Sequence, residues 1–306
     1  MVAGLVSGCR SLYPISAGRE KVPNRIVFDK LFPVWQPFAE GESQGLYYFT
    51  ARILEPKLEI WAIKADLSDP SLKIEINDGG RSTRVSSFVR NNSLLAGINT
   101  VPFDPVSARE DEERACAGVV VSESIIKSFP VPAYDAIVFY RQQNAPEHGG
   151  GSRRADIISQ GEMSDLGLVE NAAGGFKIIL REGELPPRLL PDARPNPGGD
   201  APGLEVAPRH PRSAAGLSDN GRTLYLLVID GRRKGSIGAT EAETGIILKK
   251  LGAENGLNFD GGGSTALALR FPGGKVRVVN YPIHGGIPGR ERAVAACLGI
   301  GTVENY

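Results

Sequence analysis

The stretch Asn258-Phe259-Asp260-Gly261-Gly262-Gly263-Ser264-Thr265-Ala266-Leu267 lies between two short apolar runs. The first run, residues 256–259, is followed by an aspartate, and the second, residues 266–269, begins after a serine and a threonine. This pattern predicts a strand, a tight turn and a second strand. Three consecutive glycines can adopt positive φ and direct successive N–H groups into one concavity, which suits a phosphate or an oxyanion. The alternative is a glycine-rich hairpin with no binding role.

The composition is typical of a globular protein, with 41% apolar and 23% charged residues in a chain of 306. Lysine plus arginine and aspartate plus glutamate each number 35, so the net charge is zero. A neutral chain without a basic cluster argues against a nucleic-acid partner. The 38 glycines and 22 prolines favour strands, turns and long loops over a helical bundle.

The N-terminal segment Leu5-Val6-Ser7-Gly8-Cys9 is similar to a bacterial lipobox, in which small residues precede a lipidated cysteine. We interpret residues 1–30 as a truncated lipoprotein-type signal and tether, with Cys9 as the lipidation site. The apolar run is short and lacks a basic segment before it, so coincidence is the alternative. A lipid on Cys9 predicts membrane anchoring in the bacterial cell envelope, on the periplasmic or the outer surface. Cys116 and Cys297 lie in apolar runs and are expected to be two separate buried thiols.

The predicted fold class is α+β: a mixed, mostly antiparallel sheet system with a few packed helices in a single domain, residues 31–306. Residues 31–93 supply lead-in strands, which include a hairpin of residues 45–53 and 57–67. Residues 94–306 hold the polar motifs. Within them, the proline-rich stretch 184–209 is predicted to be a long insertion or lid.

Two helices are predicted. Residues 83–91 place Thr83 at the N-cap and several apolar residues on one face. Residues 240–251 begin with Thr240 and Glu243 as a capping box and end before Gly252.

Polar side chains gather where the predicted strands end, and we expect those ends to meet in one cleft. Arginines bind phosphate through two parallel N–H groups, and paired carboxylates can divide acid and base roles. No lysine follows the glycines as in a nucleotide-binding phosphate loop, and no helix follows them as in a dinucleotide site. The three histidines (His148, His210 and His284) and the absence of cysteine–histidine spacing argue against zinc. No cofactor is expected, although Asp230 and Asp260 are compatible with a shared divalent cation.

The motif order resembles the phosphodiester glycosidase family. The resemblance rests on His210-Pro-Arg-Ser-Ala-Ala-Gly216, Asp230-Gly-Arg232, Thr240-x-x-Glu243 and Asn258 to Ser264, and it covers roughly Ala96 to the C-terminus. It implies the family fold and a phosphodiester-linked sugar substrate, of the N-acetylglucosamine α-1-phosphodiester kind. Two departures are visible. Thr100-Val-Pro-Phe103 stands where the family shows a small residue, a glycine and two aromatics, and the proline-rich insertion is atypical.

The predicted function is hydrolysis of a sugar-1-phosphodiester in envelope glycans, with Asp260 and Asp230 as acid and base and Glu241 as a further candidate. Asp230 has an alternative role as the strand-end acceptor that positions Arg232. The predicted substrate-binding residues are Arg212, Arg232, Gly261, Gly262, Gly263, Ser264, Thr265, Asn99, Gly174, Gly175 and Arg292. The alternative function is a non-catalytic lipoprotein that binds phosphoglycan or wall polymer. The sequence leaves open the bond that is cleaved and the oligomeric state.

Overall fold

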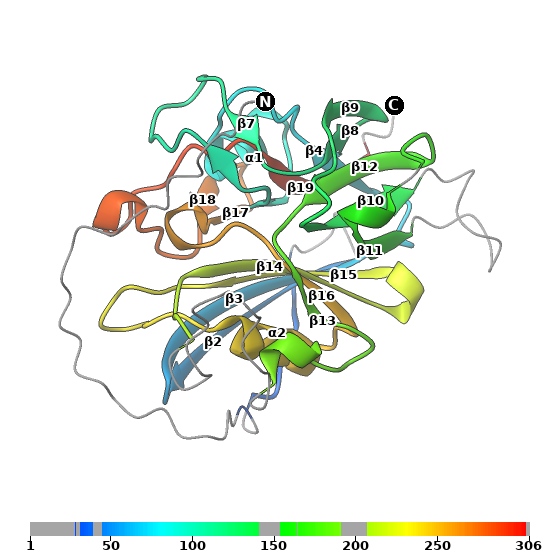
Figure 1. Ribbon diagram of the computed structural model, residues 1–306. Helices are drawn as coiled ribbons and strands as arrows, with labels where there is room; N and C mark the ends of the chain where they lie inside the picture. Colours follow the sequence, from blue (N-terminus) through cyan, green and yellow to red (C-terminus); the bar gives the residue numbers. More distant parts are fainter. Residues whose placement is uncertain are drawn as a thin grey trace, which may run out of the picture.

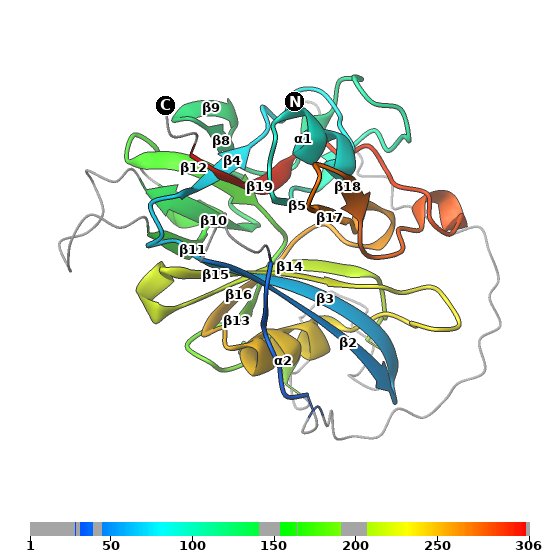
Figure 2. The same ribbon diagram turned by 180° about the vertical axis from the view of Figure 1, so that it is seen from behind.

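The computed structural model describes residues 28, 31–38, 45–140, 154–163, 165–190 and 207–303. Its strands form one seven-stranded sheet, two five-stranded sheets and a two-stranded ribbon. Figures 1 and 2 show the large sheet across the lower half, with helix α2 (Glu241–Leu251) beneath it and the smaller sheets above. Cys9, His148 and most of the proline-rich insertion lie outside the described residues.

The seven-stranded sheet contains the predicted hairpin, which is confirmed as β2 and β3 with Leu46 opposite Ala65. Residues of β3 alternate between its two faces, since Leu58 and Ile60 pack toward α2 while Ile63 and Ala65 face the smaller sheets. The strand order is β1 (Gln36–Pro37), β2 (Leu46–Leu54), β3 (Lys57–Asp66), β15 (Thr223–Ile229), β14 (Arg212–Ser218), β16 (Asn255–Asn258) and β13 (Ile178–Leu180).

The two five-stranded sheets lie on the same side of the large sheet. One has the order β18 (Val276–Val278), β17 (Leu267–Arg270), β5 (Ala96–Asn99), β19 (Cys297–Thr302) and β4 (Leu72–Ile76). The other has the order β11 (Ala155–Ser159), β10 (Asp135–Tyr140), β12 (Val169–Gly174), β8 (Val120–Ser122) and β9 (Ile125–Ser128). The ribbon pairs β6 (Phe103–Asp104) with β7 (Ala115–Cys116).

Helices are few, so the fold is mostly β, and α+β overstated their share. The described residues contain α1 (Val85–Asn91), α2 and five 3₁₀ turns: η2 (Gln160–Glu162), η3 (Pro187–Leu189), η5 (Asp219–Gly221), η6 (Gly262–Ser264) and η7 (His284–Gly286). Strand pairs within the described sheets are all antiparallel, which confirms the prediction of a mostly antiparallel system and corrects only its parallel component.

The capping predictions hold for α2 but not for α1. Thr240 and Glu243 form the expected capping box, and Gly252 ends α2 in the left-handed region at φ 113°. Helix α1 begins one residue later than predicted, with Arg84 at the N-cap and no side-chain cap. Thr83 instead pairs through its backbone with Val294, which ties the start of α1 to the entry of β19.

The main hydrophobic core lies between the large sheet and the smaller ones, and it includes Leu226, Leu257, Phe259 and Leu267. Phe259 is fully buried and directly precedes Asp260. Burial of such a side chain stabilises the fold by about 1.5–3 kcal/mol, so it anchors the glycine stretch in the core. Cys116 and Cys297 are free thiols, which confirms that they are separate; Cys297 is buried as predicted, but Cys116 is only half-buried. Among the described residues no helix combines the length and the apolar run needed to cross a membrane.

Candidate functional site

The triple-glycine stretch connects two sheets and is not a hairpin. Strand β16 belongs to the seven-stranded sheet, whereas β17 belongs to a five-stranded sheet, with turn η6 between them. The predicted pair of strands is therefore present, but the hairpin reading was wrong because the two strands do not pair with each other. The crossing brings Asp260 and the glycines to the junction of the two sheets.

Backbone N–H groups of the glycine loop are engaged within the protein. The Gly262 amide donates to the Pro211 carbonyl at 2.8 Å, and the Ser264 amide donates to the Gly261 carbonyl at 3.2 Å. The Thr265 amide donates to the Gly262 carbonyl at 3.4 Å. The amides of Gly262 and of the two residues after the glycines are thus bonded within the protein, and contact of the loop with substrate stays a prediction.

The glycines leave room for two arginine side chains. A Cβ atom added to Gly262 would lie 2.9 Å from Nη2 of Arg232, and one added to Gly263 would lie 2.5 Å from Nη2 of Arg292. Both distances are far shorter than a van der Waals contact, so any larger residue would displace the guanidinium group. The missing side chains therefore allow two positive charges to pack against the loop.

Asp260 is half-buried and lies near enough to Arg232 and Arg292 to interact with both positive charges. Desolvation raises the pKa of its carboxyl group to about 6, against the lowering effects of the Ser264 hydroxyl, Arg292, the Gly261 amide and Arg232. A carboxyl group with a pKa near neutrality can exchange a proton with a reacting group, as a general acid or base requires.

Each of the two arginines contacts a histidine. Nη2 of Arg232 lies 3.2 Å from Nδ1 of His210, and Nε of Arg292 donates to Nδ1 of His284 at 3.0 Å. Nη1 of Arg292 also donates to the Ser264 hydroxyl at 3.0 Å. Desolvation and the neighbouring arginines lower the pKa of both histidines, so the rings are neutral at pH 7. From the sequence these histidines were used to argue against zinc, and neither was named as a site residue.

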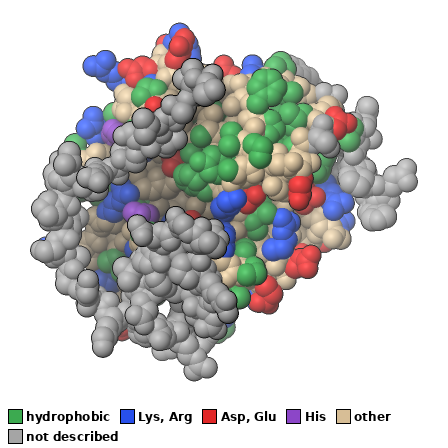
Figure 3. Space-filling model, viewed as in Figure 1, with side chains coloured by type: hydrophobic (Ala, Val, Ile, Leu, Met, Phe, Trp, Pro, Cys, Tyr) green, Lys and Arg blue, Asp and Glu red, His purple; other side chains and the backbone are tan. Residues whose placement is uncertain are grey.

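Figure 3 shows a hollow on the face viewed in Figure 1, with histidine, lysine and arginine side chains at its margin. Arg232 is exposed to solvent, while Arg292 and His284 are half-buried. Arg232 adopts the left-handed region at φ 58°, which is uncommon for a residue with a side chain and is typical of functional turns. The guanidinium and imidazole groups beside the glycine loop therefore suit an anionic ligand.

Asn99, at the end of β5, holds the Asp260 backbone in place. Its side-chain amide donates to the Asp260 carbonyl at 2.6 Å, and its Oδ1 accepts from the Ser213 hydroxyl at 2.7 Å and the Ala266 amide at 3.2 Å. The Asp260 amide donates to the Thr100 carbonyl at 2.8 Å. Residues 100–103, which depart from the family pattern, therefore begin with Thr100, whose backbone carbonyl holds the Asp260 amide.

Replacing Asn99 with alanine is expected to destabilise the fold by about 2–4 kcal/mol, because it leaves three buried polar groups without their partner. Denaturation in urea, followed by circular dichroism, measures the loss. Asn91→Ala, an exposed position at the end of α1, serves as the control and should change the free energy of unfolding by less than about 0.5 kcal/mol. Equal stability of the two variants would refute the bridging role.

Asp230 lies at the end of β15, 1% exposed, and its carboxylate accepts hydrogen bonds from several groups. They are the Asn280 amide at 3.1 Å, the Tyr281 backbone amide at 3.0 Å and Nη2 of Arg233 at 2.5 Å. Desolvation raises its pKa, and these hydrogen bonds oppose the rise. Asp230 therefore anchors Arg233. The alternative that it positions Arg232 was wrong, and its catalytic role stays a prediction.

Arg212 and Glu241 lie together at the start of α2. Nε of Arg212 donates to the Ala239 carbonyl at 2.9 Å, and its Nη1 lies 3.9 Å from the Glu241 carboxylate. Glu241 also pairs with Arg188 at 2.6 Å. Glu243 caps α2 and forms an ion pair with Arg209. The two candidates Arg212 and Glu241 thus neutralise part of each other's charge.

The remaining candidates pack around the loop. Thr265 is buried, and no protein partner is found for its hydroxyl oxygen within the described residues. The Gly174 amide donates to the Val119 carbonyl and the Gly175 amide to the Asp135 carbonyl, each at 2.8 Å. A Cβ atom on Gly175 would lie 2.7 Å from the Asn258 carbonyl. Gly175 therefore permits β12 to approach the strand that leads to Asp260.

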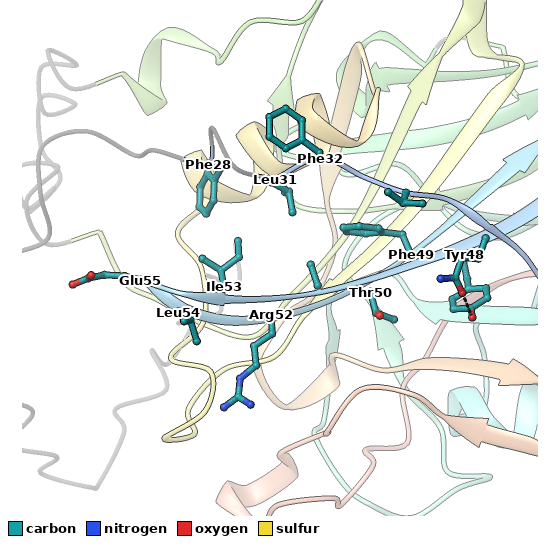
Figure 4. Close-up of a pocket in the computed structure, with 13 residues that line it drawn as sticks. Phe28, Leu31, Phe32, Tyr48, Phe49, Thr50, Arg52, Ile53, Leu54 and Glu55 are labelled. Carbon is teal, nitrogen blue, oxygen red and sulfur yellow. Dashed lines mark hydrogen bonds between the residues drawn. The ribbon is translucent and has the colours of Figure 1, made fainter.

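A cavity of about 820 Å³ lies beside β2 and is separate from these residues. Figure 4 shows Phe28, Leu31 and Ile53 on one side of β2 and Arg52 and Leu54 pointing to the other. The residues that line this cavity are mostly apolar, so the cavity is poorly suited to bind an anionic sugar. In the described part of the chain, no three histidine, cysteine, aspartate or glutamate side chains lie close enough to hold a metal ion.

The family model for phosphodiester glycosidase matches residues 92–301, which include every element of the Asp260 site. The chain belongs to the phosphodiester glycosidase family. Family membership and fold together indicate a glycosidase-type hydrolase.

One similar solved structure is the catalytic domain of zebrafish N-acetylglucosamine-1-phosphodiester alpha-N-acetylglucosaminidase, auto-inhibited by its pro-peptide. Its TM-score against this chain is 0.60, at 18% sequence identity. That similarity covers 89% of this chain and 88% of the zebrafish chain.

Two further relatives show how widely the domain occurs. A hypothetical protein from Synechocystis has a TM-score of 0.58 and 16% identity, covering 86% of this chain and 63% of that one. The SPbeta prophage-derived uncharacterized protein YomE of Bacillus subtilis is 22% identical over 253 residues, or 79% of this chain. The chain spans about a third of the length of this curated relative, 35%. At these identities the solved structures show the fold alone.

The raised pKa of Asp260 predicts a stability cost in this chain. The folded-state pKa is about 6, above the value of about 3.9 in an unfolded chain, so the cost is nearly absent below about pH 3 and nearly complete above about pH 7. Asp260→Asn is therefore expected to raise the free energy of unfolding by up to about 3 kcal/mol at about pH 8 and to leave it nearly unchanged at about pH 3. Urea denaturation at both values measures the difference, and a loss of stability at pH 8 would contradict the shift.

Proposed function

We propose that this chain hydrolyses a sugar-1-phosphodiester, of the N-acetylglucosamine α-1-phosphodiester kind, in glycans of the bacterial cell envelope. The observation that supports it most is Asp260, a half-buried carboxyl group with a pKa of about 6 that interacts with the guanidinium groups of Arg232 and Arg292. A monoanionic phosphodiester matches the two positive charges, and the carboxyl group can exchange the proton that hydrolysis requires.

In the proposed complex, Arg232 and Arg292 bind the phosphoryl oxygens, and Ser264 keeps Arg292 in place through the hydrogen bond to its hydroxyl. Asp260 exchanges a proton with the attacking water or with the leaving oxygen. Arg212 and Glu241 form a second charged group at the start of α2, which we assign to the more distant part of the substrate. Asp230 has a structural role in this proposal, because its carboxylate accepts hydrogen bonds from Arg233 and Asn280.

The test is hydrolysis of the methyl phosphodiester of α-N-acetylglucosamine in ¹⁸O-labelled water. Cleavage of the glycosidic C–O bond puts the label in the sugar and releases methyl phosphate. Cleavage of a P–O bond puts the label in the phosphate. We expect turnover with the label in the sugar, as for glycosidases generally. Absence of turnover on sugar phosphodiesters, with binding retained, would overturn the enzyme proposal and support the phosphoglycan-binding alternative.

The envelope location rests on Cys9 and is a separate proposal. We propose that lipidation of Cys9 anchors the protein at the bacterial envelope, with residues 10–30 as the tether. Metabolic labelling of the bacterial cells with an alkyne fatty acid tests it, because Cys9→Ser should then abolish labelling. Equal labelling of both forms would contradict the anchor.

A further inference from the structure

The two arginine–histidine pairs determine which ring nitrogen carries the proton. A guanidinium group has N–H donors only and cannot accept a hydrogen bond. Because Nε of Arg292 points to Nδ1 of His284 at 3.0 Å, that nitrogen must be the acceptor. The same reasoning applies to Nδ1 of His210, which lies 3.2 Å from Nη2 of Arg232. Both neutral rings must therefore carry their proton on Nε2.

The two arginine–histidine pairs near Asp260 have the same arrangement: each arginine lies beside a glycine of the loop and contacts a histidine. On one side, Gly262 leaves room for Arg232, which contacts His210. On the other, Gly263 leaves room for Arg292, which contacts His284. The histidines come from separate loops, before β14 and in η7. Each arginine is therefore held between the glycine loop on one side and an imidazole on the other.

We propose that His210 and His284 are positioning residues that hold Arg232 and Arg292 in the anion site by accepting hydrogen bonds at Nδ1. This role rests on the proposed function, in which the two guanidinium groups bind the phosphodiester. It assigns the imidazoles to orientation of the arginines and not to proton transfer. A protonated ring would lose the acceptor and repel its arginine, so the role needs the neutral form.

The protonation state can be read without substrate. Long-range ¹H–¹⁵N correlation spectra distinguish a protonated ring nitrogen from an unprotonated one, and the chain has only three histidines. His148→Gln removes the third ring from the spectrum. At pH 7.5 we expect both remaining rings to show a protonated Nε2 and an unprotonated Nδ1. A proton on Nδ1 in either ring would overturn the proposal for that pair.

Amide variants separate the two ring nitrogens chemically. In asparagine the side-chain oxygen can occupy the position of Nδ1, whereas in glutamine the amide reaches the position of Nε2. For His284, asparagine is expected to keep kcat/KM within about threefold, because the acceptor for Arg292 is retained. Glutamine is expected to lower it about 10- to 100-fold, because a hydrogen bond to a charged group is lost. The same pattern is expected at His210.

Arg90→Gln provides the control, since this exposed arginine lies at the end of α1 and is not among the groups that act on either histidine. It should leave kcat/KM and the ring spectra unchanged, whereas Arg292→Gln should remove the single Nε2 form of His284 and leave His210 as it was. Equal losses for the asparagine and glutamine variants would overturn the positioning role. If no sugar phosphodiester is turned over, the proposed function fails, while the spectra still decide the arrangement of the pairs.

Discussion

Replacing Asp260 with asparagine is expected to lower kcat/KM for the sugar phosphodiester by about 100- to 10,000-fold, the usual contribution of a general acid or base. Asparagine has nearly the same size and can keep the Ser264 contact, but it cannot exchange a proton. The loss should appear in kcat with little change in KM, because the two arginines that bind the phosphate remain.

The assay is steady-state release of N-acetylglucosamine, with Asp165→Asn at an exposed loop position as the control. The unmodified protein should show an inflection near pH 6 in its rate profile, and a rate that rises with pH would identify the carboxylate as a base. If the variant keeps more than about a tenth of the activity, Asp260 is not the group that transfers the proton.

Gly263→Ala is expected to lower kcat/KM about 10- to 100-fold or more while leaving the fold intact. The added methyl group would lie 2.5 Å from Nη2 of Arg292, so the end of that long side chain must move and give up its hydrogen bond to Ser264. Since the phosphate is charged in both the ground state and the transition state, the loss should appear mainly in KM.

Gly80→Ala is the matched control, because a Cβ atom there meets no neighbour within 4 Å. Ser264→Ala, which removes the same hydrogen bond without adding bulk, should produce a smaller loss in the same direction. If Gly263→Ala binds and turns over substrate as well as the unmodified protein, Arg292 does not bind the phosphate. Circular dichroism excludes unfolding as the cause of a loss.

The features that could be predicted from the sequence are those that depend on residues close together in the chain. The capping box of Thr240 and Glu243, the left-handed Gly252 and the β2–β3 hairpin depend on neighbours within a few positions, and the structure confirms all three. The order of the motifs was sufficient to indicate the family, whose model matches residues 92–301. Asp260 was identified as a site candidate from the glycines that follow it.

The site itself depends on contacts between residues that are far apart in the chain. Asn99 and Asp260 are separated by 161 positions, yet one side-chain amide joins them, and no periodicity reveals such a contact. The same holds for the pairing of Arg233 with Asp230 in place of Arg232, since adjacent residues in a turn point in different directions.

The sequence alone determined the local elements, the family and the acidic glycine loop, because these depend on short-range backbone preferences and on motif order. Only the tertiary structure decided what the three glycines do. As β16 and β17 enter different sheets, the loop crosses a sheet junction, where the missing side chains make room for Arg232 and Arg292. Packing between segments that are distant in the chain decides which arginine occupies each space and which histidine contacts it, because these residues come from the loops before β14, after β15 and before β19.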